Sequence, residues 1–514
     1  MQTKALCLAV LFTATLPNFI FAQGTATDSP LSAIDWLDSI PKSQPIVLVP
    51  DEPNVTNGAD VPDVSVTTLD GPAVKIIGLV PSNVSGLPRN LWSGSDAAEL
   101  ANVLANMPTL TLPAAQASLF TLLLAVADPS VGDTQKFDLA RVDALLNAGA
   151  LEPALALIEQ IGPSRSPEIA KRYLDASLLH ETEDAACDFI NAKPFLAPDY
   201  TYRIFCAARA GDWNTAALLL GTARALGTVS PTQTAILEHF LDPGLFEGEP
   251  HLPRPAKPNA LFFRMYEALG QPISTRSWPV IYANADLRDV VGWKTQIEAA
   301  ERLAQTGALP ANRLLGIYSE RQPAASGGIW DRVAAVQRFE TALNTGHKDA
   351  IIKTLPKAWR QMQSVGLGVP FATLFTQRLI ESELPSQLHK DVFAILESGT
   401  EYEAATALYP ATAARHPFRK AVAAGDVDPK LAVSLLEVAI ARGFSPGAAD
   451  ATLLKTAKNG ALGMALLRNL SALHAGTQGD MGQLSKSLGT LRALGLEDVA
   501  RRAALQMLIA QDAK

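Results

Sequence analysis

A short phrase that joins two helices recurs along this chain. In each copy a turn residue is followed five positions later by Ala and, after four more positions, by a second apolar residue. The first three copies begin at positions 149, 181 and 211, which are 32 and 30 residues apart. Intervals of this size are typical of one helical hairpin in a repeat protein. The copies are Gly149, Ala154 and Ile158; Glu181, Ala186 and Ile190; Gly211, Ala216 and Leu220; and Gly495, Ala500 and Ala504.

The residue types of the phrase suit a tight helix-to-helix connection. Gly at the turn ends the first helix and allows the left-handed conformation, and the small Ala lets two helix backbones approach closely. A single hairpin leaves an apolar face uncovered, so successive hairpins stack on one another. The pattern therefore predicts an all-α protein, an α-solenoid of stacked helical hairpins. A non-repetitive helical bundle would also contain some of these spacings and is the alternative.

The turn Gly and the following Ala at 149/154 and 211/216 resemble those of tetratricopeptide-like repeats. In architecture the pattern is similar to the superhelical domain of soluble lytic transglycosylases. The resemblance covers residues 95–241 and 331–514, and it lacks the Leu-Gly pair and the Tyr usually found in the first helix of such a repeat. It implies a superhelical scaffold without the catalytic domain of those enzymes.

Composition agrees with many small helix contacts. Hydrophobic residues make up 48% of the 514 residues but aromatic residues only 6%, so Ala, Leu, Ile and Val supply most of the core. The 35 prolines predict short, often interrupted helices and exclude a long coiled coil. The net charge of −8 argues against nucleic acid as a partner.

The first 22 residues are typical of a secretory signal peptide. Lys4 precedes an apolar stretch that is too short to span a membrane, and Pro17 and Asn18 interrupt it before Ala22. We therefore expect cleavage after Ala22 and a periplasmic or secreted protein with no transmembrane segment after cleavage. An uncleaved membrane anchor is the alternative.

Two cysteines remain after residue 22, and in an oxidising compartment an even number favours pairing. Cys187 and Cys206 lie in segments of helical composition separated by a Pro-containing loop. Successive antiparallel helices would bring them together, so we predict a Cys187–Cys206 disulfide. Two buried thiols packed as small apolar groups are the alternative.

The rest of the chain divides into four regions by composition. Residues 23–91 are rich in Pro, Asp, Asn, Ser and Gly, with a short amphipathic helix expected at 31–40, and predict an extended, partly disordered arm. Helical-repeat blocks are expected at 92–241, where Ser95 or Asp96 caps the first helix, and at 331–514. Between them, residues 242–330 form an irregular helical connector rich in Pro and aromatic residues.

Four aromatic residues in or beside the irregular stretches of this connector are the candidate binding residues. Aromatic side chains offer a large contact area and a polar tip, which suits a groove for a glycan or a peptide. Filling gaps where the stack bends is the alternative role. The residues are Trp278, Tyr282, Trp293 and Trp330.

Motifs for catalysis, metal binding and cofactor binding are not found in the sequence. The seven histidines form neither HxxxH nor HExxH, and there is no GxSxG or P-loop phrase. Glu381-Ser382 resembles the catalytic Glu-Ser pair of lytic transglycosylases, but Pro385 follows at once and the usual Gly-Leu-Met-Gln segment is missing. We therefore assign no catalytic residue, no cofactor and no metal site.

These observations favour a non-catalytic interaction scaffold in the periplasm. A stack of hairpins presents a long surface with few convergent polar groups, which suits a protein, a peptide or an envelope polymer such as peptidoglycan. Two alternatives remain open. One is an envelope glycan-cleaving enzyme, and the other is a periplasmic accessory of a motor or secretion machine.

Overall fold

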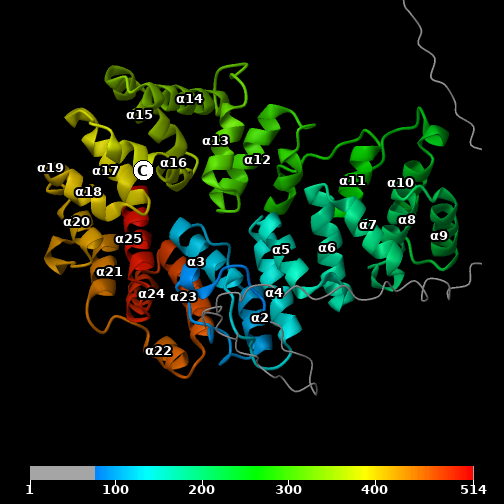
Figure 1. Ribbon diagram of the computed structural model, residues 1–514, viewed down its shortest axis with the longest axis horizontal. Coiled ribbons are helices and arrows are strands. Elements are labelled where there is room, and N and C mark those ends of the chain that lie inside the picture. Colours follow the sequence, from blue (N-terminus) through cyan, green and yellow to red (C-terminus); the bar gives the residue numbers. More distant parts are fainter. Residues whose placement is uncertain (1–75, 513–514) are drawn as a thin grey trace, which may run out of the picture. The chain divides into compact units, whose positions relative to one another are not determined.

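The computed structural model describes residues 76–512, and this part of the chain is built from α-helices joined by short 3₁₀ turns (Figure 1). It contains β contacts only as three isolated bridges, all formed by residues between 77 and 131. The all-α prediction is therefore confirmed for the described residues. The expected signal peptide at 1–22 and the expected helix at 31–40 lie outside them.

The helices that precede the connector fall between residues 82 and 241. They are α1 (Ser82–Ser85), α2 (Ala97–Ala105), α3 (Pro113–Leu124), α4 (Thr134–Asn147), α5 (Leu151–Ile161), η1 (Pro163–Arg165), α6 (Pro167–His180), α7 (Glu183–Ala192), η2 (Pro194–Leu196), α8 (Tyr200–Arg209), α9 (Trp213–Ala225) and α10 (Pro231–Leu241).

The connector and the segment after it supply the middle elements. They are η3 (Pro243–Phe246), α11 (Ala260–Ala268), η4 (Val280–Leu287), α12 (Trp293–Gln305), α13 (Ala311–Ser319), α14 (Ile329–Thr345), α15 (Lys348–Gln363), α16 (Gly368–Glu381), η5 (Ser386–Leu388), α17 (His389–Ser398), α18 (Tyr402–Leu408) and α19 (Pro410–Ala413).

The last elements complete the chain. They are α20 (Pro417–Ala424), η6 (Pro429–Leu431), α21 (Leu435–Phe444), α22 (Ala451–Lys458), α23 (Leu462–Thr477), α24 (Met481–Ala493) and α25 (Glu497–Asp512).

Each copy of the recurring phrase forms a turn between two helices, as the sequence predicts. Positions 149, 181, 211 and 495 all have left-handed backbones, with φ of 85°, 64°, 79° and 83°. Glu181 is the single non-glycine residue with positive φ in the described part of the chain. The Ala five positions later is buried in every copy. The phrase thus fixes the connections α4–α5, α6–α7, α8–α9 and α24–α25.

The predicted N-cap of the first long helix is also confirmed. The carboxylate of Asp96 accepts hydrogen bonds from the backbone N–H groups of Ala98 and Glu99 at the start of α2. In the connector, the two regular helices are α11 and α12. The segment between them forms the 3₁₀ helix η4, which packs on α12 and α6.

The first and last helices of the described chain share one hydrophobic core. α3 contacts α23 and α25, and α2 contacts α23, so the blue and the orange-to-red ends of the ribbon lie side by side (Figure 1). Trp92 packs edge-on against Phe137 and lies over Gly463 at the start of α23, and Leu91 accepts a hydrogen bond from the N–H of Gly463. A strictly linear stack has contacts only between neighbouring repeats. These end-to-end contacts are an additional feature of this chain.

Residues 76–91, the end of the predicted arm, are packed against the helices. Ile77 and Val80 form bridges with Ala127 and Ala125. The buried guanidinium of Arg141 on α4 donates to the carbonyl oxygens of Ile77 and Leu123. One side chain therefore ties this segment to the end of α3.

No helix within residues 76–512 is both long enough and apolar enough to cross a membrane.

The contact between Trp92 and Gly463 gives the first prediction. A Cβ added at Gly463 would lie 2.2 Å from the Trp92 ring, so Gly463→Ala should force the ring or α23 to move. We expect a loss of about 1–3 kcal/mol in the free energy of unfolding, measured by urea denaturation.

Gly316 on α13 is the matched control, because a Cβ there has open space within 4 Å. Gly316→Ala should be neutral or stabilising by up to ~1 kcal/mol, since Ala favours the helix. Equal effects of the two substitutions would contradict the assigned packing of the chain ends.

Candidate functional site

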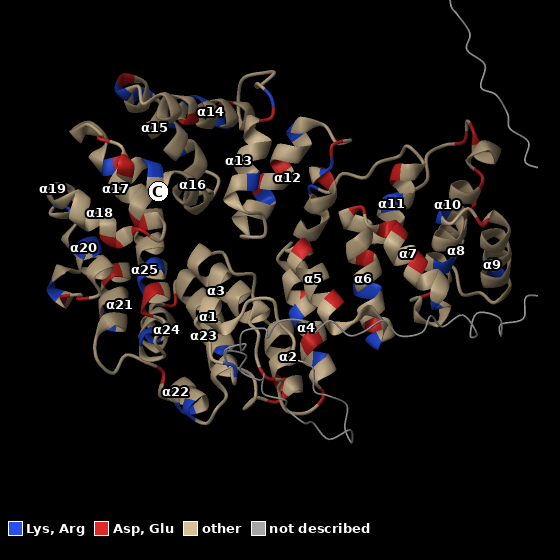
Figure 2. Ribbon diagram, in the orientation of Figure 1, with Lys and Arg blue, Asp and Glu red and all other residues tan. Residues whose placement is uncertain are grey.

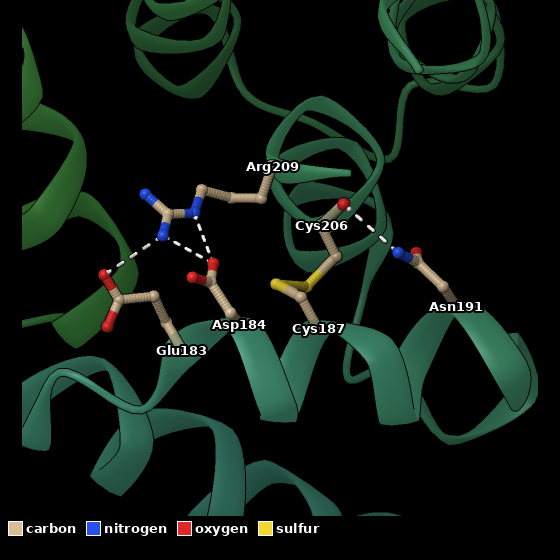
Figure 3. Close-up of a disulfide and its surroundings, with 6 residues drawn as sticks. All are labelled: Glu183, Asp184, Cys187, Asn191, Cys206 and Arg209. Atoms are coloured by element: carbon tan, nitrogen blue, oxygen red, sulfur yellow. Dashed lines mark hydrogen bonds and ion pairs between the residues drawn. A yellow bond between two sulfur atoms is a disulfide. The ribbon is translucent and has the colours of Figure 1, made fainter. Parts of the chain in front are cut away.

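A disulfide joins the second and third hairpins of the α4–α9 segment. Cys187 of α7 and Cys206 of α8 are bonded, with their Cα atoms 4.8 Å apart and 19 positions apart in sequence (Figure 3). Both residues are buried. The amide of Asn191 on α7 donates to the carbonyl oxygen of Cys206 over 3.2 Å. The predicted pairing is therefore confirmed.

Ion pairs reinforce the same junction between α7 and α8. Arg209 at the end of α8 reaches the carboxylates of Asp184 and Glu183 in the first turn of α7 (Figure 3). Glu183 also pairs with Arg264 of α11 over 2.8 Å. These contacts, together with the disulfide, hold α7, α8 and α11 together. α9 packs against α8 and is therefore attached to this cross-linked group of helices.

The outer side of α9 is apolar and exposed. We define the α9 face as the apolar residues of this side, Trp213, Ala217, Leu218, Gly221 and Ala225, all of which are exposed; the polar residues Asn214 and Arg224 are exposed on the same side. The exposed fractions of Trp213 and Leu218 are 52% and 72%. A Cβ added at Gly221 would meet no atom within 4 Å. No described residue therefore covers this side of the helix.

The earlier hairpins show why this side is unusual. Counted from the turn residue, Trp213 corresponds to Leu151 of α5 and to Glu183 of α7, and both of these are buried. The next position on the same side is occupied by Leu155 in α5, Cys187 in α7 and Ala217 in α9. Leu155 and Cys187 are buried where α5 and α7 contact the following helix, whereas Ala217 is exposed.

The helix that follows α9 leaves this side uncovered. α10 contacts both α9 and α8, and buried Leu220 and Ala223 lie on the inner side of α9. The side that α6 covers on α5, and that α8 covers on α7, consequently stays open on α9. A terminal helix in a repeat stack normally carries a polar outer side.

Charge is almost absent from this helix. Arg224 is the one charged residue of α9, and it pairs with Glu238 of α10. Figure 2 shows α9 as a mostly tan helix. In α7 the position equivalent to Leu218 is occupied by the charged and exposed Asp188. Apart from Arg224, the exposed side of α9 therefore lacks the charges that usually keep an exposed helix in water.

The four aromatic candidates from the connector form two separate pairs. Trp278 and Tyr282 meet edge to face with ring centroids 4.8 Å apart, and both contact Phe263 of α11. Tyr282 is buried, and Trp278 is half-buried with its carbonyl oxygen bonded to Arg302. This pair belongs to the core that surrounds α6, α8 and α11.

The second pair lies between α12 and α14. Trp293 and Trp330 have ring centroids 5.2 Å apart, and the indole N–H of Trp293 donates to the carbonyl oxygen of Ile317 over 2.8 Å. Trp293 is buried and Trp330 is half-buried. The surroundings of the four rings agree with the gap-filling alternative, and a binding role for them stays a prediction.

Buried ionisable groups of the connector are paired within the fold. Glu301 of α12 accepts two hydrogen bonds of 2.7 Å from Arg332 of α14 and one of 2.6 Å from the hydroxyl of Tyr318 on α13. Burial and the neighbouring carboxylate of Glu301 raise the pKa of Tyr318 well above its usual value. The three side chains link three helices and leave no free nucleophile or base at this position.

A second buried carboxylate has a strongly shifted pKa. Glu397 of α17 is fully buried and accepts a 2.8 Å hydrogen bond from Nε of Arg419, which also pairs with Asp512 near the end of α25. Burial raises the pKa of Glu397 to about 7, and the charge of Arg419 offsets only part of this effect. Since Glu397 faces Arg419 inside the core, it acts on stability.

A small polar cavity lies beside Trp92. It is lined by Ser130, Asp138 and Arg141, among others, and its volume is about 20 Å³. This volume accommodates one water molecule and no larger ligand. Burial raises the pKa of Asp138, while Arg141 and Arg165 lower it.

The residues considered for catalysis and metal binding are not assembled into a site. Glu381 is the last residue of α16, is exposed, and accepts a 2.6 Å hydrogen bond from Gln377. Among the described residues, no three His, Cys, Asp or Glu side chains are grouped so that they could hold a metal ion.

Sequence reasoning did not single out the α9 face. The available signal was the composition of residues 213–223, eleven positions without a charge that include Trp213 and three consecutive leucines. Such a run is equally typical of a buried helix. Only the positions of α8 and α10 reveal that one side is open.

A comparison with known protein families, with curated proteins and with solved structures finds no match for this chain.

The disulfide gives the second prediction. Cys187→Ser should lower the melting temperature of the oxidised protein, because the bridge restricts the unfolded chain, by an amount worth about 3 kcal/mol for a loop of this size. Differential scanning calorimetry of wild type and variant, each with and without reductant, measures the effect.

Reductant should shift only the wild type, to a value near that of the variant. If reductant lowers the melting temperature of Cys187→Ser as much as that of the wild type, the disulfide is not the source of the stabilisation.

Glu397 gives the third prediction. Its pKa is raised from 4.5 to about 7 in the folded protein, so the folded state binds the proton more tightly than the unfolded state. The resulting stabilisation is fully present below pH ~4.5 and is lost as the pH rises through 7, and its total is on the order of 3 kcal/mol. Glu397→Gln should therefore show a smaller fall in unfolding free energy between pH 5 and pH 8 than the wild type.

The exposed helix-end carboxylate of Glu381 supplies the control. Glu381→Gln should reproduce the wild-type pH profile in urea denaturation. An unchanged profile for Glu397→Gln would show that this carboxyl group does not titrate in the range.

Proposed function

We propose that this protein is an exported, non-catalytic interaction scaffold, an α-solenoid of stacked hairpins that docks a protein partner on the α9 face. The observation that carries the proposal is the uncovered apolar side of α9, with Trp213 and Leu218 exposed by 52% and 72%. An exposed apolar surface of this kind marks an interaction site in a folded protein. The disulfide and the ion pairs of Arg209 and Glu183 hold the neighbouring helices α7, α8 and α11 together.

The solenoid part of the proposal is supported by the order of the contacts. α4 to α9 contact one another in sequence, helix by helix, and three of their connections use the same left-handed turn. The end-to-end core around Trp92 and Gly463 is consistent with a stack whose first and last helices also meet. In such a scaffold, the disulfide and the ion pairs of Arg209 hold α7 and α8, the helices next to α9, in a fixed arrangement.

The chemistry of the α9 face favours a protein over a small molecule or a glycan. Trp is enriched among the residues that dominate protein–protein binding, and Leu218 beside it adds apolar area. A small-molecule site needs a concave pocket with a few convergent polar groups. The five residues of the face include none with a charged side chain, and Trp213 alone has a polar side-chain group.

Export is supported by the signal-peptide features of residues 1–22 and by the disulfide. Disulfides form and persist in oxidising compartments such as the periplasm. The Cys187–Cys206 bridge anchors α8, which forms a hairpin with α9. An oxidising compartment would therefore also stabilise the helix pair that presents the proposed surface.

A photo-crosslinking experiment tests the proposal and is the fourth prediction. A photoreactive phenylalanine analogue is placed at Leu218 in the full-length protein, expressed in its native cells, and irradiated. We expect a covalent adduct with a protein, because Leu218 is the most exposed large side chain of the proposed interface.

The same analogue at Val290 is the control, since Val290 is 80% exposed and lies outside α9. It should give no comparable adduct. Absence of a protein adduct at Leu218 would overturn the docking proposal, and release of soluble muropeptides from peptidoglycan by the purified protein would overturn the non-catalytic part.

A further inference from the structure

We propose that residues 249–255, the polyproline segment, are an exposed polyproline II ligand for a protein whose groove is lined by aromatic rings and carries a carboxylate. The segment lies in the connector, outside α9, and it is a second docking surface beyond the proposed function. It joins η3 to α11 and contains neither helix nor turn (Figure 1). Its sequence is Glu-Pro-His-Leu-Pro-Arg-Pro.

The prolines set the backbone conformation of this segment. Pro250, Pro253 and Pro255 have φ fixed at about −65°, and the residue before each proline is restricted to extended backbone. All residues of the segment except His251 are therefore constrained in this way. Such a backbone favours the polyproline II helix, which has three residues per turn.

The burial of the segment follows the same period of three. Leu252 and Pro255 are half-buried, whereas the other residues of the segment are exposed. Leu252 and Pro255 are one turn apart in a polyproline II helix, so they lie on the same ridge. That ridge is in contact with the fold, and the two other ridges face outward.

Two hydrogen bonds hold the segment against α11 and the turn that follows it. The backbone N–H of Leu252 donates to Oε1 of Gln271 over 3.1 Å. The hydroxyl of Tyr266 on α11 donates to the carbonyl oxygen of Pro253. The extended backbone is thus formed before any partner binds, and a preorganised ligand loses less conformational freedom on binding.

The outward ridges present proline rings and a cation. Pro250 and Pro253 are exposed and lie one turn, or about 9 Å, apart on the same ridge. Arg254 is exposed on the neighbouring ridge, and no carboxylate in the described part of the chain pairs with it. The nearby Glu249 has its Oε2 atom 3.8 Å from Nε2 of His239 instead.

These groups define the chemistry of the partner. Proline-rich segments in this conformation dock in grooves lined by aromatic side chains. The carbonyl oxygens of Pro250 and His251 accept no hydrogen bond within residues 76–512, so the N–H of a Trp or the O–H of a Tyr in the groove can donate to them. Arg254 pairs best with a carboxylate. The partner is therefore a protein, with a carboxylate beside its aromatic groove.

Photo-crosslinking at His251 tests the inference and is the fifth prediction. A photoreactive phenylalanine analogue replaces His251 on the outward ridge of the full-length protein, which is expressed in its native cells and irradiated. We expect a covalent adduct with a protein. Replacing both Pro250 and Pro253 by Ala should reduce the yield of this adduct about tenfold, because the main contacts are lost.

Pro429→Ala is the matched control, since Pro429 is an exposed proline at the start of η6. It should leave the yield unchanged. The melting temperature of the Pro250→Ala/Pro253→Ala variant should stay near that of the wild type, because Ala at position 253 keeps the carbonyl oxygen to which Tyr266 donates. A loss of adduct in that variant then reports on binding and not on unfolding.

Charge and conformation are tested separately. Arg254→Glu should reduce the yield about tenfold, whereas Arg254→Lys, which keeps the positive charge, should retain most of it. A synthetic peptide of residues 247–257, added in excess to a cell extract before irradiation, should suppress the adduct. The same peptide with Ala at positions 250 and 253 should not. Mass spectrometry should place the crosslinked residue of the partner beside Trp, Tyr or Phe side chains.

Three outcomes would overturn the inference: no protein adduct at His251, a yield that does not respond to the loss of both prolines, and a crosslink on a partner surface without aromatic side chains. If Leu218 gives an adduct and His251 gives none, the polyproline ligand is removed and the proposed function stands. The reverse result removes the α9 face as a docking site and leaves the polyproline ligand.

Discussion

A helical hairpin cannot cover its own apolar side, and this constraint governs the arrangement of the helices that carry the site. α5 is covered by α6, and α7 is covered by α8, so Leu151 and Cys187 are buried. The corresponding positions of α9 are Trp213 and Ala217, and both stay exposed although α10 contacts α9. The proposed interface is therefore the place where the stacking rule is left incomplete within one chain.

The disulfide and several ion pairs lie close to this open side of α9. The disulfide and the ion pairs of Arg209 join α7 to α8, and Arg264 adds α11 through Glu183. An interface residue on a rigid element loses less conformational freedom on binding than one on a mobile loop. In the proposed function, these cross-links would reduce the conformational freedom that the α9 face loses when a partner binds.

Polar residues within the cores connect different helices. Glu301, Tyr318 and Arg332 join three helices of the middle region, and Glu397 with Arg419 joins α17 to α20. Removing one member of a buried pair leaves the other without a partner, which is costly. These groups give the cores a defined arrangement, and the raised pKa of Glu397 makes that arrangement sensitive to pH.

The sequence alone determined the all-α class, the left-handed turns at Gly149, Gly211 and Gly495, the helix start at Asp96 and the Cys187–Cys206 pairing. These features depend on residues a few positions apart, or on two adjacent helices, whose conformational preferences are local. The meeting of the first and last helices, the packing of the Trp278 and Trp293 pairs, the burial of Glu397 and the open side of α9 were decided only by the tertiary structure. Whether a side chain is buried depends on which distant helix packs against it, and local sequence patterns do not identify that helix.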